Sequence, residues 1–196
     1  MAPAPVVGIL LAAGGSRRFG GDKLLFPLAD ATPLAVAAAR RLRPACDRVL
    51  AVVRPGSDQL AGLLATEGFE PVVSPDAARG MGHSLAAGIR AAPDAAGWLI
   101  ALADMPYIAP ATHVRVAEAL RDGGSIVVPE YQGRRGHPVG FGAAWGTQLA
   151  LLAGDEGARG ILGRSPEAIV RCTVDDPGIV RDVDRRADLM EDAGGH

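Results

Sequence analysis

The chain has 196 residues, of which 20 are Lys or Arg and 22 are Asp or Glu, for a formal net charge of −2. A balance this even excludes a general nucleic-acid-binding protein, which needs a basic face, but it allows a small anionic ligand held by a few cations. The length fits one domain over residues 1–196, and the composition, 48% hydrophobic and 4% aromatic, is typical of helices packed on a buried sheet.

The first predicted element is a buried strand at residues 6–12. The apolar run around it has no basic residue ahead of it and is too short to span a bilayer, so we interpret it as core and not as a signal peptide or membrane helix. We therefore expect a cytoplasmic protein. The two cysteines, Cys46 and Cys172, are too few for a disulfide framework and are expected to be buried thiols.

Short apolar runs alternate with helical stretches along the rest of the chain. Further strands are predicted at residues 49–53, 70–73, 98–103, 126–128, 139–141 and 169–174. Helices are predicted at residues 33–42, 58–67, 84–92, 110–120, 143–152 and 158–162, with Thr32, Ser57 and Ser84 as N-caps. This β-α-β rhythm predicts an α/β fold with a mostly parallel sheet and helices on both faces, which binds ligands beyond the carboxyl ends of its strands.

The loop after the first strand is the main candidate for binding phosphate. Residues 11–23 read LAAGGSRRFGGDK. The glycines let backbone N–H groups approach an anion, and Arg18 and Lys23 supply full charges. The spacing fits neither the P-loop, because Gly20 is followed by Gly21-Asp22, nor the dinucleotide fingerprint. An ordinary glycine-rich turn with solvated basic residues is the open alternative.

Carboxylates at two places are candidate metal ligands. Asp104 ends the predicted strand 98–103, where it would lie at the open edge of the sheet, and Mg²⁺ takes one or two carboxylates together with phosphate oxygens and water. Alternation places Asp182 and Asp184 on one side of an extended segment, so that one of them would be a second ligand. The alternatives are a capping role for Asp104 and a solvated acidic edge for the other two.

Two glycine-containing segments complete the candidate site. In residues 80–85, Ser84 is expected to cap the following helix, and the glycines, Gly82 among them, to leave its N-terminus open to an anion or a ribose. In residues 136–140, His137 would contact an acceptor or transfer a proton, although a lone histidine is more often structural.

Taken together, these stretches resemble the molybdenum cofactor nucleotidyltransferases (MobA-like nucleotidyltransferases), and in particular their cytidylyltransferase branch. The resemblance runs from about residue 7 to 189. It is carried by residues 11–23, 80–86, 104–106, 136–142, 154–159 and 182–184, in that order.

The resemblance implies a Rossmann-like three-layer α/β/α domain of the nucleotidyltransferase type. It further implies transfer of CMP from CTP to the phosphate of molybdenum-loaded molybdopterin, with Mg²⁺ as cofactor and pyrophosphate as by-product, and a xanthine dehydrogenase-type enzyme as recipient of the product. By matching position, Arg18 and Lys23 would bind the triphosphate, and Asp104 and Asp184 the metal.

The remaining site predictions also follow the family's motifs. The nucleotide-binding set is completed by the loop and helix residues Leu11, Ala12, Ala13, Gly14, Gly15, Gly82 and Ser84, and the acceptor-binding set is His137 and Arg159. Guanylyltransferase relatives resemble Leu-Ala-Gly-Gly at residues 11–14, so the methyl group of Ala13 would narrow the base pocket toward a pyrimidine. Relatives often continue the last motif as Thr-Pro, where this chain has Arg185-Arg186.

The predicted reaction is in-line attack of an acceptor phosphate oxygen on the α-phosphorus, catalysed by positioning and charge neutralisation without a protein nucleophile. Two alternatives stay open. One is a nucleotidyltransferase that uses GTP or acts on a sugar or polyol phosphate. The other is a non-enzymatic carrier or insertion partner for the molybdenum cofactor.

Overall fold

The structure is a computed structural model, and it describes residues 5–15 and 19–189. Its strands are β1 (Val6–Ala12), β2 (Arg48–Val53), β3 (Glu70–Val73), β4 (Gly97–Leu102), β5 (Ile126–Tyr131), β6 (Arg134–Arg135), β7 (Val139–Gly142) and β8 (Ile169–Thr173). Its α-helices are α1 (Leu34–Leu42), α2 (Asp58–Thr66), α3 (Met81–Arg90), α4 (Pro110–Arg121), α5 (Gly146–Ala150) and α6 (Arg159–Arg164).

The strands form one sheet in the order β3-β2-β1-β4-β7-β5-β6, with β8 paired to β5. Strands β1 to β4 run parallel, as do β5 and β8, whereas β7 is antiparallel to both β4 and β5. The predicted α/β fold with a mostly parallel sheet is therefore confirmed. The short edge strand β6 was not predicted.

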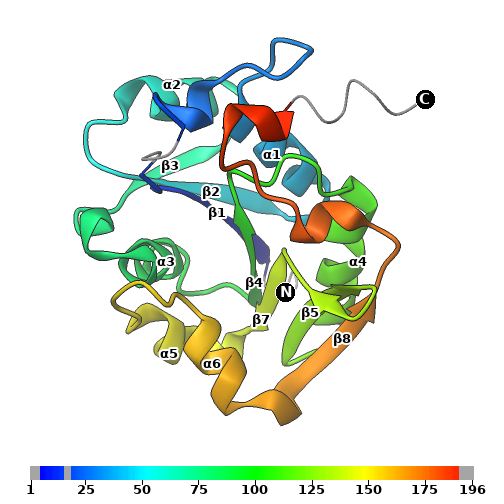
Figure 1. The fold of residues 1–196 in the computed structure, drawn as a ribbon. Coiled ribbons are helices and arrows are strands. Elements are labelled where there is room, and N and C mark those ends of the chain that lie inside the picture. Colours follow the sequence, from blue (N-terminus) through cyan, green and yellow to red (C-terminus); the bar gives the residue numbers. More distant parts are fainter. Residues whose placement is uncertain (1–4, 16–18, 190–196) are drawn as a thin grey trace.

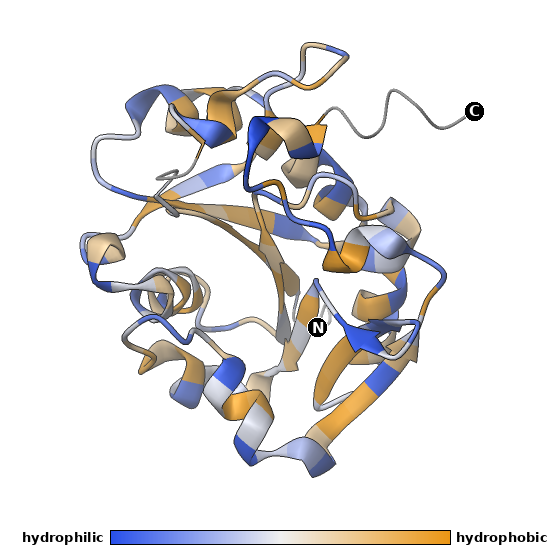
Figure 2. Ribbon diagram, viewed as in Figure 1, coloured by the Kyte–Doolittle hydropathy of each residue, from blue (hydrophilic) through white to orange (hydrophobic). Residues whose placement is uncertain are grey.

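Helices cover both faces of the sheet, and β1 shows why (Figure 1). Its side chains alternate between two buried clusters, with Val6 and Leu10 in one and Val7 and Ile9 in the other. The first cluster contains residues of α1, α2 and α4, and the second contains residues of α3, α5 and α6. Both faces of β1 are thus apolar, and much of the central sheet has the orange colour of hydrophobic residues in Figure 2.

The start of α1 differs from the prediction. The helix begins at Leu34 with Pro33 as its N-cap, so Thr32 is not the capping residue. The reason is a short antiparallel pairing before the helix, in which the N–H of Leu28 donates to the carbonyl of Thr32 and the N–H of Leu34 to that of Phe26. This pairing holds Thr32 and Pro33 extended, and the N–H of Thr32 bonds to the carboxylate of Asp30.

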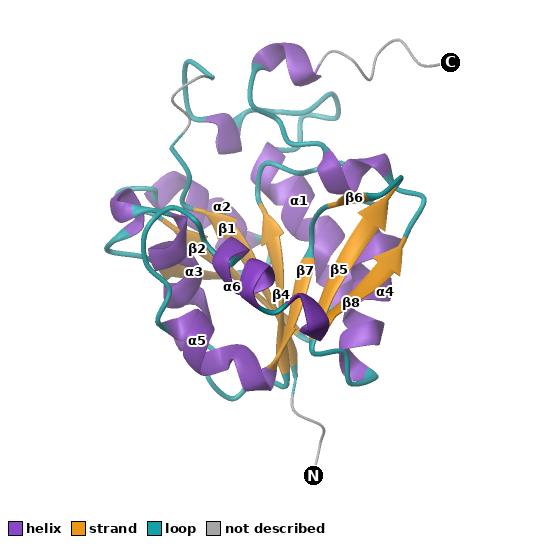
Figure 3. Cartoon of the chain, turned by 60° about the horizontal axis from the view of Figure 1, so that its bottom comes forward, coloured by secondary structure: helices purple, strands orange, loops and turns teal. Residues whose placement is uncertain are grey.

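The parallel strands bring their carboxyl ends to one edge of the sheet. There the N–H of Ala103, just after β4, donates to the carbonyl of Leu11 near the end of β1 at 3.1 Å. The final described segment, which includes the 3₁₀ helices η6 (Pro177–Val180) and η7 (Arg186–Leu189), crosses the same edge (Figure 3). Among the described residues, no helix is both long enough and apolar enough to span a bilayer.

Candidate active site

Asp104 is placed by the pairing of β4 with β1. These strands are parallel with Leu102 opposite Leu11, so the chain leaving β4 emerges beside the chain leaving β1. Asp104 follows two residues after β4, and its side chain is 27% exposed. The carboxylate predicted at the open edge of the sheet therefore lies next to the glycine-rich loop, where a shared ligand would contact both.

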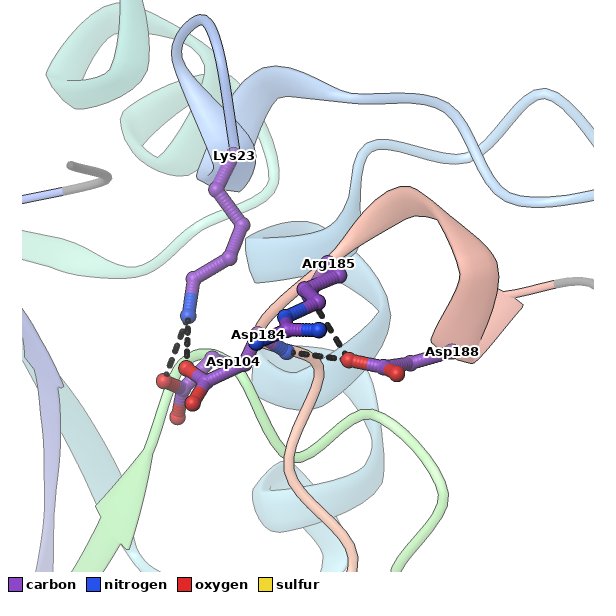
Figure 4. Close-up of polar contacts among 5 residues, drawn as sticks. All are labelled: Lys23, Asp104, Asp184, Arg185 and Asp188. Atoms are coloured by element: carbon purple, nitrogen blue, oxygen red, sulfur yellow. Dashed lines mark hydrogen bonds and ion pairs between the residues drawn. The ribbon is translucent and has the colours of Figure 1, made fainter. Parts of the chain in front are cut away.

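Lys23 reaches that carboxylate from the other end of the loop. It begins the 3₁₀ helix η1 (Lys23–Leu25), which is anchored by the buried Leu24. Its Nζ lies 2.9 Å from Oδ2 of Asp104 and 3.5 Å from Oδ1 of Asp184 (Figure 4). The lysine side chain is only 11% exposed, so this ammonium group is fixed between two carboxylates from distant parts of the sequence.

The C-terminal segment brings two more carboxylates to the same place. The N–H of Val183 donates to the carbonyl of Asp104 at 2.9 Å, and the Val183 side chain is fully buried. With Val183 turned inward, Asp182 and Asp184 both project toward Asp104, which confirms that they share one side of an extended segment. One carboxylate oxygen from each of the three residues lies within 4.8 Å of the others.

This donor set fits a divalent cation. Three carboxylates supply hard oxygen ligands of the kind that Mg²⁺ and Mn²⁺ prefer, and both metals commonly complete their coordination with water and substrate phosphate. The ammonium of Lys23 neutralises only part of the negative charge that the three carboxylates bring together. Asp104, Asp182 and Asp184 would therefore hold the metal, and the side chain of Asp184 is about half exposed.

Asp188 closes the turn that carries Asp184. Its Oδ2 accepts hydrogen bonds from the N–H groups of Asp184 at 2.8 Å and Arg185 at 2.7 Å. These bonds lower the pKa of the Asp188 carboxyl. The guanidinium of Arg181 donates to the carbonyl of Asp188 at 3.0 Å, which ties the two ends of the segment together.

Arg186 joins the same turn to the glycine-rich loop. Its guanidinium lies over the rings of Phe26, at 5.2 Å from the ring centroid, and Phe19, at 5.7 Å. The two rings pack edge to face, and they flank the segment that holds Lys23. Arg186, in the stretch where relatives often have Thr-Pro, thus contacts the glycine-rich loop and the segment that follows it.

Two glycines of the glycine-rich loop, Gly14 and Gly15, lie in open space among the described residues. A Cβ atom added at Gly14 or Gly15 would meet no described atom within 4 Å, so neither glycine is required by a described neighbour. Leu11 and Ala12 belong to β1 and Ala13 follows it directly, so residues 11–15, which are predicted to bind the nucleotide, run continuously from the sheet edge. Arg18 lies outside the described residues, and its role stays a prediction.

The prediction that Ser84 caps α3 is wrong. The helix begins at Met81 with Gly80 as N-cap, and Ser84 lies in its interior, 4% exposed. The glycines here serve packing: a Cβ on Gly82 would lie 2.6 Å from the carbonyl oxygen of Ala153. The N–H of Gly82 donates to Gly154 at 2.8 Å, so the first turn of the helix is partly covered by that loop. The proposed nucleotide contacts of Gly82 and Ser84 remain predictions.

His137 lies two residues before the start of β7. Its N–H donates to the carbonyl of Ile179 at 3.0 Å, and its buried Nδ1 has no hydrogen-bond partner among the described residues. Burial lowers the pKa of His137; the Ile100 carbonyl and the Asp104 charge oppose this shift, and Arg159 adds to it. A lowered pKa keeps the imidazole neutral at pH 7. The charge of Arg159, the other residue predicted to bind the acceptor, therefore acts on the pKa of His137, as does the charge of Asp104.

Sequence reasoning missed the roles of Asp188 and Arg186. The role of Asp188 could have been found from the sequence, because short polar side chains in turns commonly accept hydrogen bonds from backbone N–H groups a few residues away. The role of Arg186 has no signal in the sequence, because its contact with Phe19 and Phe26 depends on how distant segments pack together.

A mostly parallel sheet whose first strand leads into a glycine-rich loop, with a lysine at the end of that loop bonded to a carboxylate cluster, is typical of α/β enzyme domains that bind nucleotide phosphates. Residues 8–169 match the MobA-like NTP transferase domain, and the chain belongs to this family of nucleotidyltransferases.

Two relatives and two solved structures illustrate the similarity. The chain is 32% identical to nicotine blue oxidoreductase of Paenarthrobacter nicotinovorans over 188 residues, covering 91% of this chain and 92% of that protein. It is 33% identical to the purine catabolism protein PucB of Bacillus subtilis strain 168 over 166 residues, covering 80% of each. The oxidoreductase activity named for the Paenarthrobacter protein belongs to that protein.

The crystal structure of Rv0371c from Mycobacterium tuberculosis H37Rv superimposes with a TM-score of 0.86 at 30% identity, covering 97% of this chain and all of that one. A second structure of Rv0371c, in complex with manganese, has a TM-score of 0.78 at 27% identity and covers 95% of this chain and 97% of that one. A protein of this fold therefore forms a complex with manganese.

Proposed function

We propose that this protein transfers CMP from CTP to the terminal phosphate of molybdenum-loaded molybdopterin and releases pyrophosphate. The observation that carries the proposal is the meeting of Lys23 with Asp104 and Asp184 beside the glycine-rich loop. The family of MobA-like NTP transferases supports nucleotidyl transfer, and the motif resemblance supports the acceptor. The methyl group of Ala13 favours a pyrimidine base, and the product would pass to a xanthine dehydrogenase-type enzyme.

The phosphate chain of the nucleotide would lie between the glycine-rich loop and the carboxylate cluster. Backbone N–H groups at Gly14 and Gly15 would donate to phosphate oxygens, and Lys23 and Arg18 would neutralise charge on the departing pyrophosphate. Asp104, Asp182 and Asp184 would hold Mg²⁺, which when bound supplies Lewis-acid stabilisation of the phosphate oxygens. In this proposal the glycine-rich loop contacts one side of the phosphate chain and the metal held by the carboxylates contacts the other.

The acceptor supplies the nucleophile. An oxygen of its phosphate forms a bond to the α-phosphorus while the bond from that phosphorus to the bridging oxygen of pyrophosphate breaks, and the electron pair leaves with pyrophosphate. A phosphate monoester is already an anion, so no protein group has to be activated for the attack. Arg159 would bind the acceptor phosphate, and a neutral His137 would hydrogen-bond to it.

Pyrophosphate release tests the proposal. We would measure it with Mg²⁺ and CTP, GTP or ATP, with and without molybdenum-loaded molybdopterin, and expect release only with CTP and the acceptor together. Release with GTP or with a sugar or polyol phosphate would instead support the other transferase hypothesis. Tight nucleotide binding without any pyrophosphate would support the non-enzymatic carrier.

A pair of matched variants tests the role of Asp104 in the same assay. Asp104→Asn should lower the rate by about 10²–10³-fold or more, the loss typical of one key electrostatic group, while leaving the fold intact. Asp175→Asn is the control, because Asp175 is an exposed carboxylate of the same C-terminal region outside the cluster. An Asp104→Asn variant that releases pyrophosphate at the wild-type rate would refute the metal-binding role of Asp104.

A further inference from the structure

Asp184 differs from Asp104 in how it is supported. Asp104 follows a buried central strand, whereas Asp184 lies on an irregular segment with its side chain 49% exposed. The buried Val183 and its hydrogen bond to Asp104 fix the chain on one side of Asp184. On the other side, within the described residues, the chain continues only into the short 3₁₀ helix η7, so besides the ion pair with Lys23 a local interaction is needed to orient the backbone that carries this carboxylate.

The Asp188 carboxylate supplies that restraint. One oxygen, Oδ2, accepts from the N–H groups of both Asp184 and Arg185, at 2.8 and 2.7 Å (Figure 4). Charge-assisted bonds to successive backbone N–H groups orient the peptide planes on which the Asp184 side chain is mounted. The backbone of Asp188 is itself held by the Arg181 guanidinium and by its own N–H bond to the Arg185 carbonyl.

We infer that Asp188 is a positioning residue for the metal site: it holds Asp184 toward Asp104 and Lys23 without contacting the metal or the nucleotide itself. This inference rests on the proposed function only in giving the cluster a metal to bind. Outer partners of metal ligands typically contribute about 10- to 100-fold in metal affinity.

Direct binding of Mn²⁺, followed by the electron paramagnetic resonance signal of the free ion, tests this role without nucleotide or turnover. We expect Asp188→Ala to weaken Mn²⁺ binding by about 10- to 100-fold. Asp175→Ala, which removes an exposed carboxylate from the same region, should bind as the wild type does. Cooperative thermal unfolding of each variant would show that the fold is retained.

Asp188→Asn separates positioning from charge. Because a single oxygen accepts both bonds, the Oδ1 of an asparagine can replace it, and the negative charge is removed. Positioning predicts that Asp188→Asn keeps most of the affinity that Asp188→Ala loses. In transfer assays, Asp188→Ala should raise the metal concentration needed for half-maximal rate more than it lowers the rate at saturating metal.

Three results would overturn the inference: wild-type affinity for Mn²⁺ in Asp188→Ala, equal losses in Asp188→Asn and Asp188→Ala, or no binding of Mn²⁺ by the wild-type protein. The proposed function fails in a different way. If Mn²⁺ binding depends on Asp188 but no nucleotide yields pyrophosphate, the positioning role stands and the transfer reaction is wrong.

Discussion

The ammonium of Lys23 lies 2.9 Å from a carboxylate oxygen of Asp104, although 81 positions of sequence separate the two residues. The contact joins the end of the glycine-rich loop to the end of the fourth strand, and it extends to Asp184 at 3.5 Å. A cation is therefore already present among the carboxylates that we assign to the metal. From this arrangement we expect Lys23 and the metal to compete for the same oxygens in the absence of nucleotide.

Lys23→Met tests that competition. Removing the ammonium should leave Mn²⁺ binding to the nucleotide-free protein unchanged or tighter, because Asp104 and Asp184 lose a competing partner. Pyrophosphate formation should nevertheless fall by about 10²–10³-fold, because the charge that stabilises the departing group is lost. Metal binding and turnover are measured on the same preparation. Weaker Mn²⁺ binding in Lys23→Met would show that the lysine supports the metal site and does not compete for it.

Two glycine substitutions should separate binding from stability. Gly14→Ala adds a methyl group where no described atom lies within 4 Å, so the free energy of unfolding should change by less than about 0.5 kcal/mol. The same methyl should obstruct the approach of a phosphate chain and weaken CTP binding by about tenfold or more, as measured by calorimetry. Unchanged CTP affinity would place the nucleotide elsewhere.

Gly82→Ala is the matched substitution with the opposite expectation. Its Cβ would lie 2.6 Å from the carbonyl oxygen of Ala153, a backbone atom that cannot move without its loop. Overpacking of this kind costs roughly 1–3 kcal/mol, which chemical denaturation would detect. A variant as stable as the wild type would show that the 153–154 loop does not hold the start of α3.

Arg186→Ala should loosen the contact between the C-terminal turn and the glycine-rich loop. The guanidinium lies over Phe19 and Phe26 at an exposed position, where such contacts are worth about 0.5–1 kcal/mol. We expect a stability loss of that size and a higher KM for CTP, because the loop segment that holds Lys23 is less restrained. Arg134→Ala, at an exposed edge strand, is the control, and equal effects of the two substitutions would argue against a specific contact.

The buried His113 should make stability depend on pH. Burial lowers its pKa to about 4, an effect that the charge of Asp176 partly opposes, whereas an exposed histidine titrates near 6.5. Between these values the unfolded chain takes up a proton that the folded protein does not. Stability is therefore lost as the pH falls from 6.5 toward 4, by about 3 kcal/mol in total. His113→Gln should flatten this part of the stability profile, and an unchanged slope would contradict the lowered pKa.

Much of the fold could be predicted because its signals are local. Strand β1 reads as an apolar run because both of its faces are buried, and Asp104 is placed at the sheet edge by the end of another such run. The same-side placement of Asp182 and Asp184 follows from alternation alone. These features need only the neighbouring residues.

The rest could not be predicted because it depends on contacts between distant segments. Residues 80–82 carry glycines because the loop at Ala153 and Gly154 packs on them, and a pattern read locally mistakes this for an open helix start. The C-terminal turn reaches Asp104 through the backbone bond of Val183, which no spacing reveals. Part of the phosphate-binding prediction, the role of Arg18, lies outside the described residues.

A crystal structure of the protein with CTP and Mn²⁺ would test the central claim most directly. The account predicts the metal on oxygens of Asp104 and Asp184, the phosphate chain along Gly14 and Gly15, and the Lys23 ammonium bonded to a phosphate oxygen. A nucleotide bound away from this edge of the sheet, or a metal that contacts neither aspartate, would contradict it.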